Sequence, residues 1–227
     1  MNIPIVRRVL EKNNAAAAEN RALFDSLDVR CVNILGGAGS GKTALLEAVI
    51  PLIKPRAAVF VFEGDLATTR DAQRIAALVV PVVQLLTDGG GHLTAPHVRR
   101  AVVRLDLAGG GLLLIENVGN PVCPANFDLG EHARIAVLSV TEGDDKPAKY
   151  PLLFQRADLI ALTKCDLLTH TDFDIERASR DARRINPTAP IVQMSMRRGD
   201  GPARVAAWLI DMIRSNERRT NTKLIHA

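Results

Sequence analysis

The chain has 227 residues, of which 47% are hydrophobic, and a formal net charge of +4. Its length suits one domain, and its acidic and basic residues are mixed along the chain. Aromatic residues are only 4% of the chain, so the stacking platforms used to bind nucleic acid are lacking. Three scattered cysteines form no disulfide framework, and no apolar run is long enough for a membrane span. We expect a cytoplasmic protein that binds neither nucleic acid nor membrane.

A leading segment of helix-forming residues, 5–27, precedes an alternation of short apolar runs and helical segments. The later helices are predicted at 42–53, 70–79, 95–107, 174–185 and 203–214. The strands are predicted at 31–35, 57–62, 81–86, 111–116, 134–140, 157–163 and 190–195. These strands are apolar throughout, which is typical of strands buried on both faces. The pattern predicts an α/β fold with a mostly parallel sheet of about seven strands and helices on both faces.

No linker or repeat divides the chain, so we expect a single domain overall. Residues 1–28 are predicted to supply a helix packed on the domain that residues 29–227 form.

A phosphate-binding motif follows the first of these strands. Residues 36–43 read Gly-Gly-Ala-Gly-Ser-Gly-Lys-Thr and match G-x-x-x-x-G-K-[ST] between a strand and a helix, the setting that this motif requires. The glycines let backbone N–H groups surround a polyphosphate, Lys42 can reach the β- and γ-phosphates, and the Thr43 hydroxyl can ligate Mg²⁺. The predicted nucleotide-binding residues of this segment are Gly37, Ala38, Gly39, Ser40, Gly41, Lys42, Thr43 and Ala44.

Two acidic residues stand where ligands bind in such sheets, beyond the carboxyl ends of strands. Asp65 closes Glu63-Gly64-Asp65 after the second strand, and Glu116 ends the strand at 111–116. P-loop enzymes place a carboxylate there to organise Mg²⁺ or water. We therefore predict that Asp65 and Glu116 lie in or near a magnesium shell with Thr43, and that they act with Lys42 in hydrolysis. Taken alone, either residue is as well explained as a loop cap.

A further motif, Thr163-Lys164-Cys165-Asp166, follows the strand at 157–163. The carboxylate of Asp166 can accept hydrogen bonds from N1–H and the 2-amino group of guanine, a donor pair that adenine lacks. The stem of Lys164 can lie over the base. The next strand ends at Ser195-Met196-Arg197, the position of a second base-contacting loop. The sequence thus predicts GTP and GDP as ligands.

Two longer segments carry a family resemblance. Residues 116–131, Glu-Asn-Val-Gly-Asn-Pro-Val-Cys-Pro-Ala-Asn-Phe-Asp-Leu-Gly-Glu, and residues 139–151 closely resemble the hydrogenase nickel-incorporation GTPases, the HypB family. The likeness extends over nearly the whole chain and implies a SIMIBI-type P-loop GTPase. It also implies a nucleotide-gated homodimer with slow GTP hydrolysis that helps to deliver nickel to a [NiFe] hydrogenase large-subunit precursor, with a HypA-type metallochaperone as partner.

The resemblance further implies a nickel or zinc site, from which this sequence departs. The family uses a Cys-His pair and a second cysteine in V-C-P-A; here His92 and Cys123 match, but Gly91 stands at the first cysteine. Two chains would then offer two histidines and two cysteines, which can fill a tetrahedral Zn²⁺ or Ni²⁺ site. Because half of the nearby thiolates are lost, we expect a weaker affinity or a changed metal preference.

A second departure is Thr163, which stands at the asparagine of the family's N-K-x-D motif. Its hydroxyl can still bond the P-loop, but it has no amide to reach the base. Two alternatives stay open. One is a GTP-switched dimerisation adaptor that has lost metal handling, which Gly91 favours; the other is a GTPase that serves another nickel enzyme such as urease.

Overall fold

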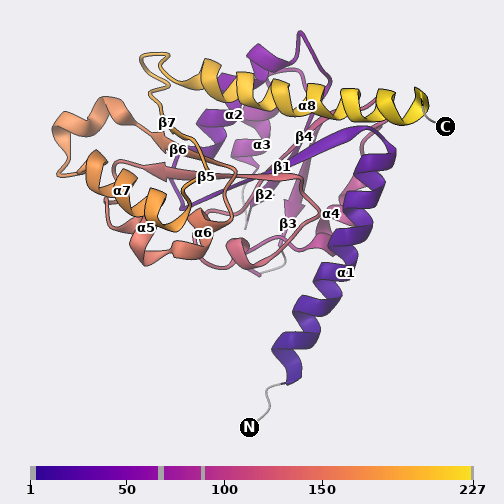
Figure 1. Cartoon of the computed structure of the whole chain (residues 1–227), viewed down its shortest axis with the longest axis horizontal. Helices are drawn as coiled ribbons and strands as arrows, with labels where there is room; N and C mark the ends of the chain where they lie inside the picture. The colour runs from indigo at the N-terminus through magenta and orange to yellow at the C-terminus, as the bar shows by residue number, and fades with distance from the viewer. Residues whose placement is uncertain (1–3, 66–68, 88–89, 226–227) are drawn as a thin grey trace.

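The computed structural model describes residues 4–65, 69–87 and 90–225, arranged around one central sheet (Figure 1). Seven strands of this described region pair in parallel in the order β3-β2-β4-β1-β5-β6-β7. The strands are β1 Val29–Gly36, β2 Val59–Asp65, β3 Val82–Leu86, β4 Gly111–Glu116, β5 Ala133–Ser139, β6 Leu159–Thr163 and β7 Ile191–Gln193. The predicted parallel sheet of about seven strands is confirmed.

Helices cover both faces of this sheet. Core residues of α2, α3 and α8 pack on one face, while α1 and α4 pack on the other face beside α6 and α7. The helices are α1 Pro4–Ser26, α2 Lys42–Ile53, α3 Arg70–Ala76, α4 Ala95–Val102, α5 Lys146–Lys149, α6 Pro151–Gln155, α7 Ile175–Ile185 and α8 Pro202–Ile225. Two 3₁₀ turns, η1 Pro124–Asn126 and η2 Cys165–His170, lie in the connections.

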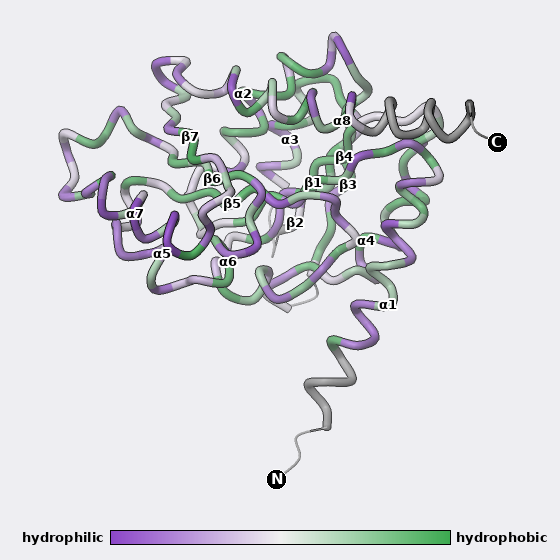
Figure 2. Tube along the Cα trace, viewed as in Figure 1, coloured by the Kyte–Doolittle hydropathy of each residue, from purple (hydrophilic) through white to green (hydrophobic). Residues whose placement is uncertain are grey.

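The strands are apolar throughout because they supply side chains to both layers of helices. In β1, Val32 and Ile34 belong to the core beneath α2 and α8, whereas Cys31 and Leu35 belong to the cores of the opposite face. Successive strand residues point to opposite faces, so a strand covered on both sides has no polar face. Figure 2 shows the result, with hydrophobic strands at the centre and a largely hydrophilic α7 outside.

Strand β2 is longer than predicted. It continues through Asp65, so Glu63-Gly64-Asp65 lies within the strand rather than in a loop after it. The pairing of Glu63 with Gln84 and of Asp65 with Leu86 in β3 explains the extension, because a neighbouring strand supplies partners for this polar stretch.

Several helix ends also differ from the prediction. Helix α3 ends at Ala76 and is followed by Val79 with φ of +57°, a left-handed conformation that cannot continue an α-helix. Helix α4 ends at Val102 rather than 107, and α8 continues to Ile225. The short α5 and α6 were not predicted, because helices of four and five residues show too little periodicity.

Helix α1 is held to the turn that follows η1. Asn20 is fully buried, and its Nδ2 donates to the carbonyl oxygens of Leu129 and Ala95, each at 2.9 Å. Arg21 donates to both carboxylate oxygens of Asp128, at 2.8 and 2.9 Å. Gly130 lies against this part of the helix with φ of +92°. The contacts fix the leading helix against the segment that precedes β5.

Substituting Gly130 with alanine should test this packing. A Cβ there would lie 2.7 Å from the carbonyl oxygen of Ala17 in α1, so Gly130→Ala should lower the free energy of unfolding by about 2–4 kcal/mol. Gly109→Ala is the matched control, since Gly109 has φ of +98° with nothing within 4 Å of its Cβ, and should cost about 1 kcal/mol. Urea unfolding followed by circular dichroism measures both. Equal losses would contradict the close packing of α1 on this turn.

Candidate functional site

A cleft of about 290 Å³ opens at the carboxyl ends of β1, β2 and β4. Strand β1 lies between β4 and β5, so the chain order reverses at this place, where open α/β sheets bind ligands. The lining residues are Ala38, Gly39, Gly41, Lys42, Thr43, Ala44, Glu63, Gly64, Asp71, Arg74, Glu116, Asn117 and Gly119. Six of the eight predicted P-loop residues and Glu116 therefore line one cavity, whereas Gly37 and Ser40 are not part of its lining and Ser40 is fully buried.

The phosphate-binding loop has the backbone that its glycines permit. Gly39 and Gly41 have φ of +72° and +96°, and α2 begins directly after them at Lys42, which directs its N-terminus at the cleft. The Lys42 ammonium is buried and donates to the carbonyl oxygens of Gly36 at 3.3 Å and Gly37 at 3.0 Å. Burial lowers the pKa of Lys42, against the opposing effect of Glu116. This cation is positioned to meet a polyphosphate in the loop.

Thr43 and Glu116 are in direct contact across the cleft. The Thr43 hydroxyl donates to Oε1 of Glu116 at 2.7 Å, and Oε2 of Glu116 is buried with no hydrogen-bond partner among the described residues. Burial raises the pKa of Glu116 to about 7, although the Thr43 hydrogen bond and the Lys42 charge oppose the shift. A hydroxyl beside a carboxylate with a free oxygen is a hard oxygen donor set that fits Mg²⁺.

A second carboxylate of the cleft, Glu63, was missed in the sequence analysis. Its Cα is the register partner of Glu116 on the adjacent strand, and its side chain is buried. Asp65 ends the same strand, but its side chain lies outside the described residues. Alternate residues of a strand share a face, so Glu63 and Asp65 lie on the same face of β2. A strand that extends to residue 65 therefore makes Glu63 a candidate for the cleft together with Asp65.

Two charged residues of α3, Asp71 and Arg74, also line the cleft without having been predicted. The Arg74 guanidinium bonds Glu47 on α2, at 2.6 and 2.9 Å, and Asp71 at 2.9 Å. Hydrogen bonding to Glu47 raises the pKa of Arg74. Residues 66–68, between β2 and α3, lie outside the described structure. The helix itself was predicted, but no sequence motif marked Asp71 or Arg74 as residues of a site.

The predicted base loop adjoins the P-loop. Thr163 Oγ1 donates to the carbonyl oxygen of Ser40, so the expected bond from this threonine to the P-loop is confirmed. Lys164 has φ of +58°, and its ammonium donates to the carbonyl oxygen of Gly39 at 2.7 Å. These two bonds fix the start of η2 against the phosphate-binding loop.

The carboxylate of Asp166 is held by the second predicted base loop. Ser195 Oγ donates to Asp166 Oδ1 at 2.7 Å, and this hydrogen bond lowers the pKa of Asp166. Met196 packs against the core beneath α2 and α8, whereas Arg197 is exposed. The structure thus brings Asp166 and Ser195 together, while Met196 is partly buried against the core.

The loops that carry His92 and Cys123 lie side by side. The His92 ring stacks on Phe127 with the ring centroids 4.1 Å apart, and burial lowers the pKa of His92, which favours the neutral imidazole. The side-chain Oδ1 of Asn120 accepts from the backbone N–H of the exposed Cys123 at 3.3 Å, and Nδ2 of Asn120 donates to the carbonyl oxygen of Gly91 at 3.5 Å. No group of three or more potential metal ligands occurs among the described residues.

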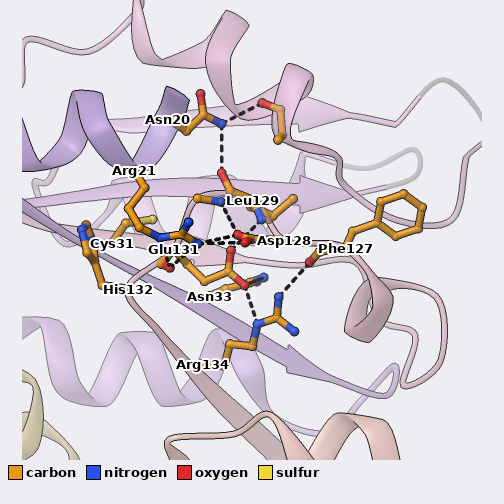
Figure 3. A network of polar contacts seen from close by, with 12 residues as sticks. Asn20, Arg21, Cys31, Asn33, Phe127, Asp128, Leu129, Glu131, His132 and Arg134 are labelled. Carbon is orange, nitrogen blue, oxygen red and sulfur yellow. Dashed lines mark hydrogen bonds and ion pairs between the residues drawn. The ribbon is translucent and has the colours of Figure 1, made fainter. Parts of the chain in front are cut away.

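A buried polar network, which sequence analysis did not find, supports these loops (Figure 3). Glu131 Oε1 accepts from Arg134 Nε and from Asn33 Nδ2, and Glu131 Oε2 accepts from the backbone of Leu129 at 2.6 Å. Arg134 also donates to the carbonyl oxygen of Phe127 at 3.1 Å. Burial raises the pKa of Glu131, and Arg134 opposes the shift. The network fixes the segment that presents Phe127 to His92.

The fold and the cleft define a P-loop nucleotide-binding protein. In agreement, the model of the CobW/HypB/UreG nucleotide-binding domain matches residues 30–193. A hydrogenase maturation factor HypB from Azotobacter vinelandii is 49% identical over 220 residues, covering 97% of this chain and 70% of that protein. The chain belongs to the HypB family of hydrogenase maturation factors.

Solved structures of relatives have the same fold. The hydrogenase maturation factor HypB of Archaeoglobus fulgidus superposes with a TM-score of 0.84 at 35% identity, covering 90% of this chain and all of that one. HypB of Helicobacter pylori, determined in complex with nickel, superposes with a TM-score of 0.86 at 34% identity, covering 90% and 96% of the two chains. The P-loop GTPase fold is confirmed. Across the described residues, no helix has the length and apolarity to span a membrane.

Replacing Glu116 with glutamine should change how stability depends on pH. A folded-state pKa raised to about 7 means that the folded protein binds this proton more tightly than the unfolded chain does. The free energy of unfolding therefore falls as pH rises from about 4.5 through about 7. Glutamine does not titrate. The free energy of unfolding of Glu116→Gln should therefore be about 3 kcal/mol higher than that of the parent above this pH window and equal to it below the window.

Urea unfolding at about pH 4 and about pH 8, without nucleotide or Mg²⁺, measures this difference. Glu176→Gln, which changes an exposed glutamate at the start of α7, serves as the control and should show no such pH dependence. A Glu116→Gln profile parallel to that of the parent would contradict the raised pKa.

Proposed function

We propose that this protein binds and slowly hydrolyses GTP and, as a nucleotide-gated homodimer, assists nickel insertion during [NiFe] hydrogenase maturation. One observation carries the proposal: the cleft with Lys42, Thr43 and Glu116 adjoins, through Asn117 and its loop, the segments that hold His92 and Cys123. Family membership supports a role in hydrogenase maturation. By the same resemblance, a HypA-type metallochaperone and a hydrogenase large-subunit precursor are the proposed partners. The free cysteines suit a reducing compartment, the cytoplasm.

In the proposed mechanism, the backbone N–H groups of the P-loop surround the phosphates and Lys42 leaves its carbonyl partners to contact the β- and γ-phosphates. Mg²⁺, held by Thr43 with Glu116 in or near its shell, would neutralise the charge on the phosphates. Glu116 and the neighbouring Glu63, with Asp65 as a further candidate, orient water for attack on the γ-phosphate. The chain contributes positioning and electrostatics rather than a covalent intermediate, and slow turnover is expected.

In this proposal nickel is the cargo of the protein and is bound between two copies of the chain. One chain offers His92 and Cys123, which fall short of the four ligands of a tetrahedral site, whereas two chains offer four. A neutral imidazole and an exposed thiol are suited to Ni²⁺ or Zn²⁺. Asn120 links the two loops, and Asn117 connects them to the nucleotide cleft, since its Oδ1 accepts from the backbone of Leu93. Nucleotide state and metal geometry would therefore influence each other.

Asp166→Asn should switch the base preference of the protein. Guanine presents two donors to the carboxylate, and xanthine replaces the 2-amino donor with a carbonyl oxygen, which the asparagine amide can meet. We expect GDP affinity to fall about 100-fold, as for the loss of charge-assisted hydrogen bonds, and XDP affinity to rise. Displacement of a fluorescent nucleotide analogue measures both. Asp172→Asn, an exposed position in the next loop, should leave them unchanged, and unchanged GDP affinity in Asp166→Asn would exclude Asp166 as the base contact.

Metal titration tests the central proposal. With a chromophoric chelator as competitor, we expect about half a Ni²⁺ or Zn²⁺ per chain, with an affinity that differs between GDP-loaded and GTP-analogue-loaded protein and is lost in Cys123→Ala. Gly91→Cys should raise the affinity about tenfold or more, because it restores a thiolate. Among the described residues a Cβ at Gly91 meets only Asn120 Nδ2, at the ordinary contact distance of 3.7 Å.

The same titration separates the proposal from its alternative. Gly91 favours a GTP-switched dimerisation adaptor without its own metal site. Nucleotide binding with no metal affinity tighter than the micromolar range in either nucleotide state would establish that adaptor instead. Metal binding that survives Cys123→Ala would place the site elsewhere in the chain. A client other than hydrogenase, such as urease, would be recognised by which apoenzyme this protein activates in a reconstituted assay.

A further inference from the structure

Strand β3 ends the sheet on one side and presents an apolar edge. Residues 82–86 read Val-Val-Gln-Leu-Leu, with no charged residue and no proline, and pair with β2 on one side only among the described strands. Leu86 is 56% exposed. Proteins usually protect such edges with charges, prolines or a covering segment, because the edge can pair with another chain. Strand β3 has none of these sequence devices.

A groove of about 370 Å³ runs along this edge. Four consecutive strand residues, 83–86, line it, although neighbouring strand residues point to opposite faces. The groove must therefore follow the backbone edge of β3 rather than one face of the sheet. Its other wall is α4 and the turn after it, through His97, Arg100, Ala101 and Arg104. In Figure 1, α4 lies beside β3 at the end of the sheet, in line with these contacts.

The α4 wall of the groove is basic. Arg100 and Arg104 are both exposed, neither guanidinium has a hydrogen bond or ion pair with a described residue, and the described residues that line the groove include no carboxylate. Arg100 lies in the last turn of α4, and Arg104 lies in the turn that follows, where its backbone N–H donates to the carbonyl oxygen of Ala101. Alternate residues of an extended strand point to the same face, so acidic side chains at every second position can face the wall that carries both arginines.

We propose that this groove is a docking site for an extended acidic peptide segment of a partner protein, which adds a strand to β3 and places carboxylates against Arg100 and Arg104. Backbone hydrogen bonds to β3 supply affinity and the arginines supply selectivity, as in other strand-addition interfaces. The intervening residues of the peptide point to the opposite face of the sheet, on the side of Val82 and the exposed Leu86. This site is separate from the nucleotide cleft and does not depend on the function proposed above.

The charge of the groove disfavours a second copy of this chain as the occupant. In a two-fold symmetric contact the same patch faces itself, so arginines of both copies would be brought together, and the described lining of the groove offers no carboxylate to pair with them. An acidic peptide gives each guanidinium a partner instead.

Fluorescence anisotropy with a labelled peptide that alternates valine and glutamate tests the proposal on the full chain. We expect saturable binding that slows backbone hydrogen exchange at residues 82–86. Arg100→Glu combined with Arg104→Glu should weaken binding about tenfold or more, with unchanged GTP turnover. Arg99→Glu is the matched control, because Arg99 is exposed on the same helix but does not line the groove. It should bind like the parent.

Two further probes sharpen the test. The same peptide with lysine in place of glutamate, or with alternate backbone nitrogens methylated, should bind at least about tenfold more weakly. Equal binding of the lysine peptide, equal effects of Arg99→Glu and the double variant, or no binding of the glutamate peptide would overturn the proposal. So would sedimentation showing that the double variant, without peptide, alters the association of the chain with itself, since the edge would then be an interface between copies.

Discussion

The buried carboxylate of Glu131 is the contact on which the arrangement of the loops above the sheet depends. Its oxygens accept from Asn33 on β1, from the backbone of Leu129 and from Arg134 on β5. One side chain therefore joins two central strands to the turn that precedes β5. A buried charge is tolerated only when it is fully paired, and loss of one partner from such a pair costs about 3–5 kcal/mol. The turn at residues 128–131 therefore has one position relative to the sheet, and α1 docks on that turn.

The same network reaches both halves of the candidate site. Arg134 donates to the carbonyl oxygen of Phe127, whose ring stacks on that of His92. Asn33 accepts from the side chain of Asn117, the residue that follows Glu116. A shift of the strand end on nucleotide binding would therefore reach the His92 loop through hydrogen bonds and packed rings. Such coupling is reciprocal, so a metal that alters the affinity for GTP has its own affinity altered by the same factor.

The fold and much of the nucleotide cleft could be predicted from sequence, because a continuous apolar strand or a glycine-rich loop is a local signal. Thr43 and Glu116 were found this way, and they are in contact. Glu63 was missed because its role depends on the register of β2 against β4, which is set by pairing between distant segments. The Glu131–Arg134 pair was missed for a related reason, since a charged residue near a strand gives no sign in sequence that it is buried.

Lys42 and Glu116 already have partners in the cleft before any ligand arrives, although Oε2 of Glu116 has none among the described residues. Lys42 donates to two carbonyl oxygens of its own loop, and Glu116 shares the hydroxyl of Thr43 while burial favours its protonated form. On the function proposed above, a phosphate would replace the carbonyl oxygens as partner of Lys42, and a cation would displace the proton of Glu116. The affinity for each ligand would then be the difference between its new contacts and those that the ligand-free cleft already makes. Nucleotide and cation would favour each other, because the cation neutralises charge on the phosphates.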